Sequence, residues 1–209
     1  MSGETREKLI EVARQHFAAK GFFGASLSRI AAELGISKQA LLYHFGCKED
    51  LYAEVLQRIS EKLMRFVRMA EDQNEPPQQQ FETVVISLYR AALEAPEDSR
   101  LLMREMLDNQ SRAGEANSWY LDPFLDGLVS IVWREPALER RSDAELFSFV
   151  YQVLGAVEHF VLSRTTLSRL YGDEAIDEVA DTYPAELRGM VRRFFDEAHR
   201  AQARRVPAE

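Results

Sequence analysis

Cysteine is almost absent from the chain, which has one thiol, that of Cys47, among 209 residues. A single thiol cannot form an internal disulfide, which is typical of proteins in a reducing cytoplasm. Histidine is also scarce, and none of the four histidines has the close spacing of metal ligands. We therefore expect a cytoplasmic protein that has no disulfide, metal or cofactor.

Long hydrophobic runs are missing as well. The longest runs, such as residues 129–133, are far shorter than a bilayer span. The N-terminus is polar and charged, so it shows no secretory signal. The chain also has no nucleophile elbow and no phosphate-binding glycine loop. These absences predict a protein that is neither membrane-embedded nor an enzyme.

Most of the chain shows helical periodicity instead. No segment has the sustained two-residue alternation of a strand, whereas apolar residues recur every three or four positions. We therefore predict an all-α fold. Helices are expected over residues 5–20, 27–34, 38–45, 48–72, 81–95, 97–109, 119–134, 142–170 and 184–203, with a short piece near 175–183.

Charge is distributed unevenly along the chain, whose net charge is −8. Residues 1–50 carry seven Lys and Arg against six Asp and Glu, and the rest of the chain carries nineteen against twenty-eight. The whole protein is therefore too acidic to coat nucleic acid nonspecifically. The nearly neutral N-terminal segment still permits a local contact with a polyanion.

Two very short helices flank Gly35 in this N-terminal segment. Neither is long enough to be stable alone, so a third helix, expected over 5–20, must brace them. Two helices joined by a glycine-containing turn form a helix-turn-helix. Packing between the helices accounts for their apolar positions, Ile30, Ala31, Leu34, Ile36, Leu41 and Phe45.

The outer side of the second helix then carries side chains suited to a DNA groove. Lys38 and Gln39 can hydrogen-bond to base edges, and Leu42 can contact a thymine methyl group. Tyr43 and His44 can donate hydrogen bonds to phosphates. Ser37 precedes this helix and can cap it.

The segment SLSRIAAELGISKQALLYHFGCKEDL, residues 26–51, resembles the DNA-binding signature of the TetR/AcrR family of bacterial regulators. The resemblance covers about residues 5–55. It implies backbone contact by Ser26, an early recognition-helix contact by Lys38, and phosphate contacts that include Lys48. The predicted DNA-binding residues are Ser26, Ser28, Ser37, Lys38, Gln39, Leu42, Tyr43, His44 and Lys48.

Three positions depart from the family pattern. Gln39 stands where glycine is frequent, Leu42 where a tyrosine is usual, and Cys47 where a small polar residue is usual. The first two lie on the predicted reading face, so they leave the operator sequence open. A redox role for Cys47 would require a lowered thiol pKa.

The resemblance also implies how the whole protein works. Residues 1–47 would form the DNA-binding domain, and residues 48–209 a ligand-binding and dimerisation domain, with helix 48–72 linking the two. The protein would be a homodimer that represses transcription at a palindromic operator in double-stranded DNA. A small, largely apolar effector would release it by shifting the dimer to an arrangement unsuited to the DNA.

Apolar and aromatic residues of the second domain suggest where the effector and the partner subunit bind. The candidate effector-binding residues are Met103, Met106, Asn109, Trp119, Tyr120, Phe124, Tyr151, Gln152 and His159. The candidate dimer-interface residues are Phe149, Val153, Val157, Val161, Leu187, Val191, Phe194 and Phe195. The alternative is a helical lipid- or small-molecule-binding protein of the same fold that does not bind DNA.

Overall fold

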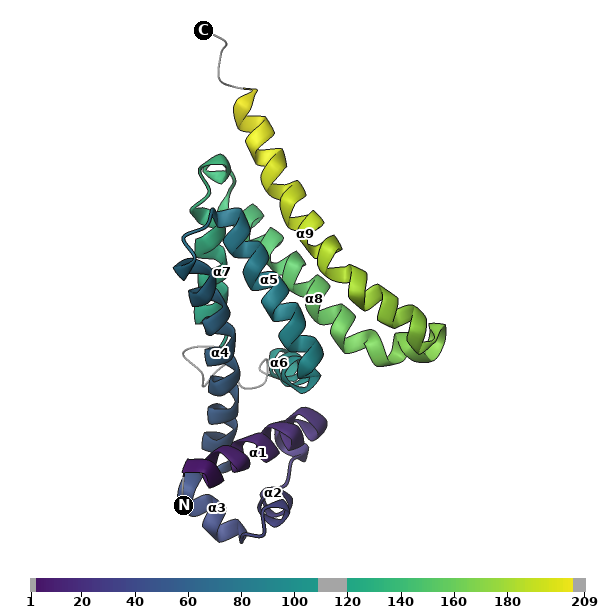
Figure 1. Cartoon of the computed structure of the whole chain (residues 1–209). Coiled ribbons are helices and arrows are strands. Elements are labelled where there is room, and N and C mark those ends of the chain that lie inside the picture. Colours follow the sequence, from purple (N-terminus) through teal and green to yellow (C-terminus); the bar gives the residue numbers. More distant parts are fainter. Residues whose placement is uncertain (1–2, 109–119, 205–209) are drawn as a thin grey trace. The chain divides into compact units, whose positions relative to one another are not determined.

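The computed structural model describes residues 3–108 and 120–204 (Figure 1). The regular elements in these residues are helices, which confirms the predicted all-α class. They are α1 (Gly3–Gly24), α2 (Leu27–Glu33), α3 (Lys38–Phe45), α4 (Lys48–Asp72), α5 (Pro77–Glu94), α6 (Pro96–Asp108), α7 (Asp122–Trp133), the 3₁₀ helix η2 (Pro136–Leu138), α8 (Asp143–Tyr171) and α9 (Asp173–Ala203).

The chain divides into two compact units. Unit 1 comprises residues 1–62 and 95–120, and unit 2 comprises residues 63–94 and 121–209. Helix α4 therefore passes from unit 1 into unit 2, and α6 packs with the N-terminal helices. The sequence pattern did not indicate this place for α6. The functional boundary expected between residues 47 and 48 stays a prediction.

Unit 1 is built around α1. Helix α1 packs against α2 and α6, and α2 packs against α3. The side chains of Leu9, Phe17 and Leu51 have no accessible surface and lie at the centre of this core. The regular part of α1 ends at Gly21, whose φ of 69° places it in the left-handed region that glycine tolerates. This agrees with the helix end predicted at Lys20.

Unit 2 is held together by α5, which packs against α7, α8 and α9. Residues of α8 and α9 that were predicted to form a dimer interface lie in this core. Phe194 alone among them is partly exposed, and the other seven are buried: Phe149, Val153, Val157, Val161, Leu187, Val191 and Phe195. Phe149, Val161 and Phe194 keep some accessible surface, and whether the eight residues form a dimer contact stays a prediction.

Helix α9 continues through Pro184, where the sequence pattern predicted the start of a separate helix. Proline has no N–H group, so it leaves the carbonyl four residues earlier, that of Ala180, without its helical donor. The hydroxyl of Tyr89 on α5 donates a hydrogen bond to this carbonyl (2.8 Å). Burial raises the pKa of Tyr89 to about 12, so the hydroxyl stays a donor. A tertiary contact thus makes an internal proline tolerable.

Helix α8 is long and apolar enough, by length and composition alone, to cross a membrane. The sequence pattern predicted no such segment, because the longest apolar runs of the chain are short. Its buried side packs against α5 and α9, as in the core helix of a helical protein. Its other side also carries apolar residues, including Phe147 and Tyr151, which are 47% and 49% exposed. The helix is therefore apolar on two faces, one of them uncovered in the single chain.

Candidate nucleic-acid interface

The turn between α2 and α3 has the geometry of a helix-turn-helix. Gly35 adopts a φ of 66°, and the amides of Gly35 and Ile36 donate to the carbonyls of Ala32 and Ala31 (both 3.1 Å). The Ser37 hydroxyl accepts a hydrogen bond from the Ala40 amide (3.1 Å) and caps α3, as predicted. The turn therefore fixes the direction in which α3 leaves it.

The two faces of α3 are separated as the sequence predicted. Leu41 and Phe45 are buried against the rest of unit 1, whereas Lys38, Gln39 and Tyr43 are exposed. The Tyr43 side chain is 85% exposed, although aromatic rings are usually at least partly covered. An exposed cation, amide and phenol on one short helix form a surface that can hydrogen-bond to bases and phosphates.

The remaining predicted DNA contacts differ in their exposure. Leu42 and His44 are half-buried, and the His44 ring lies edge-on to that of Tyr43 (5.2 Å between centroids). Ser26 precedes α2, but its side chain makes no capping hydrogen bond there, and Ser28 is exposed. The Ser26 hydroxyl is therefore not used to cap α2. Whether these residues contact DNA stays a prediction.

Lys48 lies differently from the predicted phosphate contact. Its ammonium donates to the backbone carbonyl of Phe23 (3.4 Å) and lies 4.9 Å from the centroid of the Phe22 ring. Burial lowers the pKa of Lys48. In this structure the side chain ties the start of α4 to the end of α1. A phosphate contact by its ammonium would require it to leave both partners.

Cys47 and Asp50 cap the N-terminus of α4 reciprocally. The Cys47 amide donates to Asp50 Oδ2 (3.2 Å), and the Asp50 amide donates to Cys47 Sγ (3.4 Å). This is the arrangement of a capping box, with sulfur in place of a hydroxyl. The hydrogen bond from the thiol to the Asp50 carboxylate raises the pKa of Cys47. A thiol held neutral in this way is a poor redox switch.

Gly46, between α3 and α4, is expected to be intolerant of a side chain. Its φ is 78°, and a Cβ added there would lie 2.8 Å from Asp50 Oδ2, which the α4 cap holds in place. We expect Gly46→Ala to lower the free energy of unfolding by about 1–3 kcal/mol, measured by urea denaturation. Gly35→Ala is the control, because its φ is also positive but a Cβ there meets nothing within 4 Å. Equal losses in the two variants would contradict a role for the cap.

The predicted effector-binding residues are spread over both units. Asn109 and Trp119 lie outside the described residues. Those in unit 1 are half-buried: Met103, Met106 and Tyr120. In unit 2, Phe124 is buried, and the other three lie exposed on α8: Tyr151, Gln152 and His159. The buried Phe124 and the exposed residues of α8 do not line a common cavity in the described part of unit 2. The effector site therefore stays a prediction.

The exposed side of α8 has a feature that the sequence pattern did not indicate. The rings of Phe147 and Tyr151 stack on each other, with centroids 5.9 Å apart. An open groove of about 360 Å³ also lies between α8 and α9, and its lining includes Ser148, Phe149 and Phe194. The rings of Phe149 and Phe194 are stacked 3.8 Å apart. Unit 2 therefore presents both protruding rings and an open groove lined by two stacked rings and by polar side chains such as Arg141, Glu145 and Gln152.

Comparison with known proteins gives sequence matches over part of the chain. Residues 9–55 match the family described as bacterial regulatory proteins, tetR family. The chain is 39% identical over 67 residues to the HTH-type transcriptional activator FasR of Mycolicibacterium smegmatis, and this match covers 32% of this chain and 31% of FasR. It is also 31% identical over 102 residues to the HTH-type transcriptional regulator RutR of Escherichia coli, and this match covers 49% of this chain and 48% of RutR. The chain thus matches less than half the length of these curated relatives.

The fold extends the similarity beyond the matched segment. The structure of a TetR-like transcriptional regulator from Rhodococcus sp. RHA1 has a TM-score of 0.64 to this chain. The two are 20% identical, and the match covers 91% of this chain and 95% of that one. At this identity the likeness shows the fold alone. Residues 9–55 therefore match the DNA-binding segment of the TetR family of bacterial regulatory proteins, and the chain as a whole has the fold of a TetR-like regulator.

Proposed function

We propose that the protein is a DNA-binding transcriptional regulator. The observation that carries this proposal is the exposed face of α3, where Lys38, Gln39 and Tyr43 project from a helix-turn-helix within the family-matched segment. A helix of this kind enters the major groove with its N-terminal residues against base edges. Lys38 and Gln39 lie in the first turn of α3, so they are the residues placed to read sequence.

Contacts with the DNA backbone complete the proposed interface. The phenol of Tyr43 and the imidazole of His44 can donate to phosphate oxygens, and so can the hydroxyl of Ser26. These contacts would hold α3 in the groove without distinguishing one base pair from another. Sequence preference would then come mainly from Gln39, whose amide can make paired hydrogen bonds with an adenine edge.

We also propose that the protein is a homodimer, whose subunits meet through the exposed side of α8 and α9. Phe147 and Tyr151 are exposed on α8, and the groove whose lining includes Phe149 and Phe194 lies between the same two helices. A two-fold axis lets protruding rings of each subunit meet a hollow of the other, so the surface can pair with itself. Two recognition helices related by this axis would read a palindromic operator.

The proposed regulator is a repressor, and a small, largely apolar effector controls its affinity for DNA. An effector changes DNA binding only if it binds more tightly to one of two arrangements of the dimer. FasR is named an activator, whereas AcnR of Corynebacterium glutamicum, 31% identical over 93 residues, is named a repressor. The direction of control therefore has to be measured on the regulated promoter. We place the protein in the cytoplasm, with the DNA it contacts.

A direct binding experiment tests the proposed function. The full chain is titrated against a random-sequence duplex at several salt concentrations, and duplexes that it retains from a random library are then sequenced. We expect log K to fall linearly with log salt, by about 0.9 for each phosphate neutralised, and the selected sequences to be palindromic. A lipid- or small-molecule-binding protein of this fold that does not bind DNA would show neither result.

A further inference from the structure

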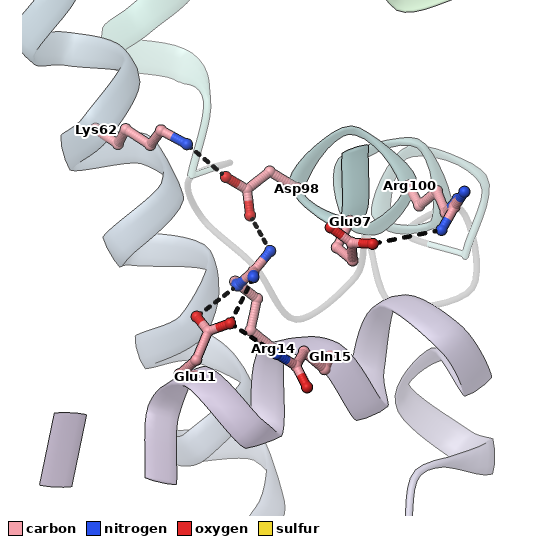
Figure 2. Close-up of polar contacts among 7 residues, drawn as sticks. All are labelled: Glu11, Arg14, Gln15, Lys62, Glu97, Asp98 and Arg100. Atoms are coloured by element: carbon pink, nitrogen blue, oxygen red, sulfur yellow. Dashed lines mark hydrogen bonds and ion pairs between the residues drawn. The ribbon is translucent and has the colours of Figure 1, made fainter. Parts of the chain in front are cut away.

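Asp98 connects three helices of unit 1 (Figure 2). It lies in the first turn of α6. Its Oδ1 accepts a hydrogen bond from Arg14 Nη1 on α1 (2.7 Å), and its Oδ2 accepts one from Lys62 Nζ on α4 (2.9 Å). The side chains of Asp98 and Arg14 are only 14% and 18% exposed. One carboxylate therefore pairs with a cation on each of two other helices.

Arg14 is held from a second side. Its Nη2 and Nε donate to the two carboxylate oxygens of Glu11 (2.6 and 2.9 Å), one turn earlier in α1. The Glu11 hydrogen bonds raise the pKa of Arg14, so the guanidinium stays charged. Exposed ion pairs contribute little to stability, but Asp98 and Arg14 are largely buried, so removing either one leaves uncompensated charge. Asp98 is the member of this group that reaches α6.

The Asp98 carboxylate joins parts of unit 1 that are far apart in the sequence. Lys62 is the last residue of α4 that belongs to unit 1, and the chain re-enters unit 1 at Ala95, just before α6. Asp98 therefore ties together the segment by which the chain leaves unit 1 and the segment by which it returns. It also holds both of them to α1.

A second contact ties α6 to the core under the helix-turn-helix. The Tyr52 hydroxyl on α4 donates to Glu105 Oε2 on α6 (2.8 Å), and both residues are buried. The Tyr52 ring lies edge-on to Phe17 and Phe22 of α1, at 4.8 and 5.1 Å between centroids. Helix α6 is thus attached to α1 and α4 near its start and to α4 near its end.

We infer that Asp98 is a positioning residue for DNA binding. It contacts no DNA itself, but it holds α1, against which α2 packs, and α4, which follows α3 in the chain, in one arrangement. This inference rests on the proposed DNA-binding function. The loss of Asp98 would let α6 shift against α1 and α4, and the folded protein would then bind a preferred sequence less well.

The test compares Asp98→Asn with Glu97→Gln in the full chain. Glu97 neighbours Asp98 in the same turn but pairs with Arg100 of α6 (3.7 Å), so its loss breaks no contact between helices. Each variant removes one negative charge at nearly the same place, and long-range attraction to DNA changes equally in both. Affinity is measured on a duplex selected by the wild type and on a scrambled duplex, at a temperature where thermal melting shows each variant folded.

We expect Asp98→Asn to lose about tenfold in affinity for the selected duplex, the scale of coupling between neighbouring charged residues, and Glu97→Gln to stay within about twofold of wild type. The ratio of selected to scrambled affinity should fall for Asp98→Asn alone. Asp98→Glu keeps the charge and should restore most of the loss. If Asp98→Asn does not fold, Lys62→Gln, which removes one of the two contacts, takes its place. Its control is Arg100→Gln, which also removes one positive charge but breaks only the pair with Glu97 inside α6.

A folded Asp98→Asn variant with wild-type affinity and discrimination would overturn the inference while leaving the proposed function intact, even if its melting temperature fell. Equal losses for Asp98→Asn and Glu97→Gln would overturn it as well, because they would show an effect of charge alone. If the wild type selects no sequence, the proposed function fails, and the inference fails with it.

Discussion

A Tyr151→Glu variant is expected to be monomeric at concentrations at which the wild-type protein is a dimer. Tyr151 is 49% exposed and stacks on Phe147 on the uncovered side of α8. A carboxylate there would be buried without a partner in the proposed interface, at a cost of several kcal/mol. Since each 1.4 kcal/mol is a factor of ten, we expect dimerisation to weaken on the order of 100-fold or more.

Light scattering over a range of protein concentrations measures this effect. Trp133→Glu is the matched control, since it also replaces an exposed aromatic residue of unit 2 (55% exposed) with glutamate, but at the end of α7. The control should keep the mass of a dimer. The monomeric variant should also bind a palindromic duplex far more weakly than wild type, because one recognition helix reads only half of the site. A dimeric Tyr151→Glu protein would place the interface elsewhere.

A Gln39→Ala variant is expected to lose sequence discrimination at one symmetric pair of operator positions. Gln39 is exposed in the first turn of α3, where its amide can pair with an adenine edge. The loss should be about 1–3 kcal/mol at each half-site, so a dimer would lose about twice this on the selected duplex. The salt dependence of binding should not change, because no phosphate contact is removed.

Tyr43→Phe is the companion variant for this measurement. It removes only the exposed phenolic hydroxyl, and neither substitution changes the net charge of the protein. We expect Tyr43→Phe to weaken binding to selected and scrambled duplexes by the same factor, because phosphate contacts carry no sequence information. Titrations of all three proteins on both duplexes separate the two roles. Equal losses on both duplexes for Gln39→Ala would assign this residue to the DNA backbone instead.

Local signals in the sequence were enough to predict the helix-turn-helix and the exposed face of α3. Gly35 and Ser37 mark the turn and the start of α3 through local backbone chemistry. Leu41 and Phe45 differ from Lys38 and Gln39 so strongly in polarity that the short helix has only one possible inner side. The signals for these features lie within a few residues of one another, so periodicity and capping rules were sufficient.

The packing of whole helices was needed to show which apolar side of α8 faces the core. Periodicity identifies apolar positions, but α8 has two apolar faces, and the face with Phe149 and Val153 is covered by α5 and α9, while Phe147 and Tyr151 are left exposed. The pairing of Asp98 with Arg14, which lies 84 residues away in the sequence, has no local signal at all. Contacts between distant segments depend on how whole helices pack, and a one-dimensional pattern of polarity does not contain that information.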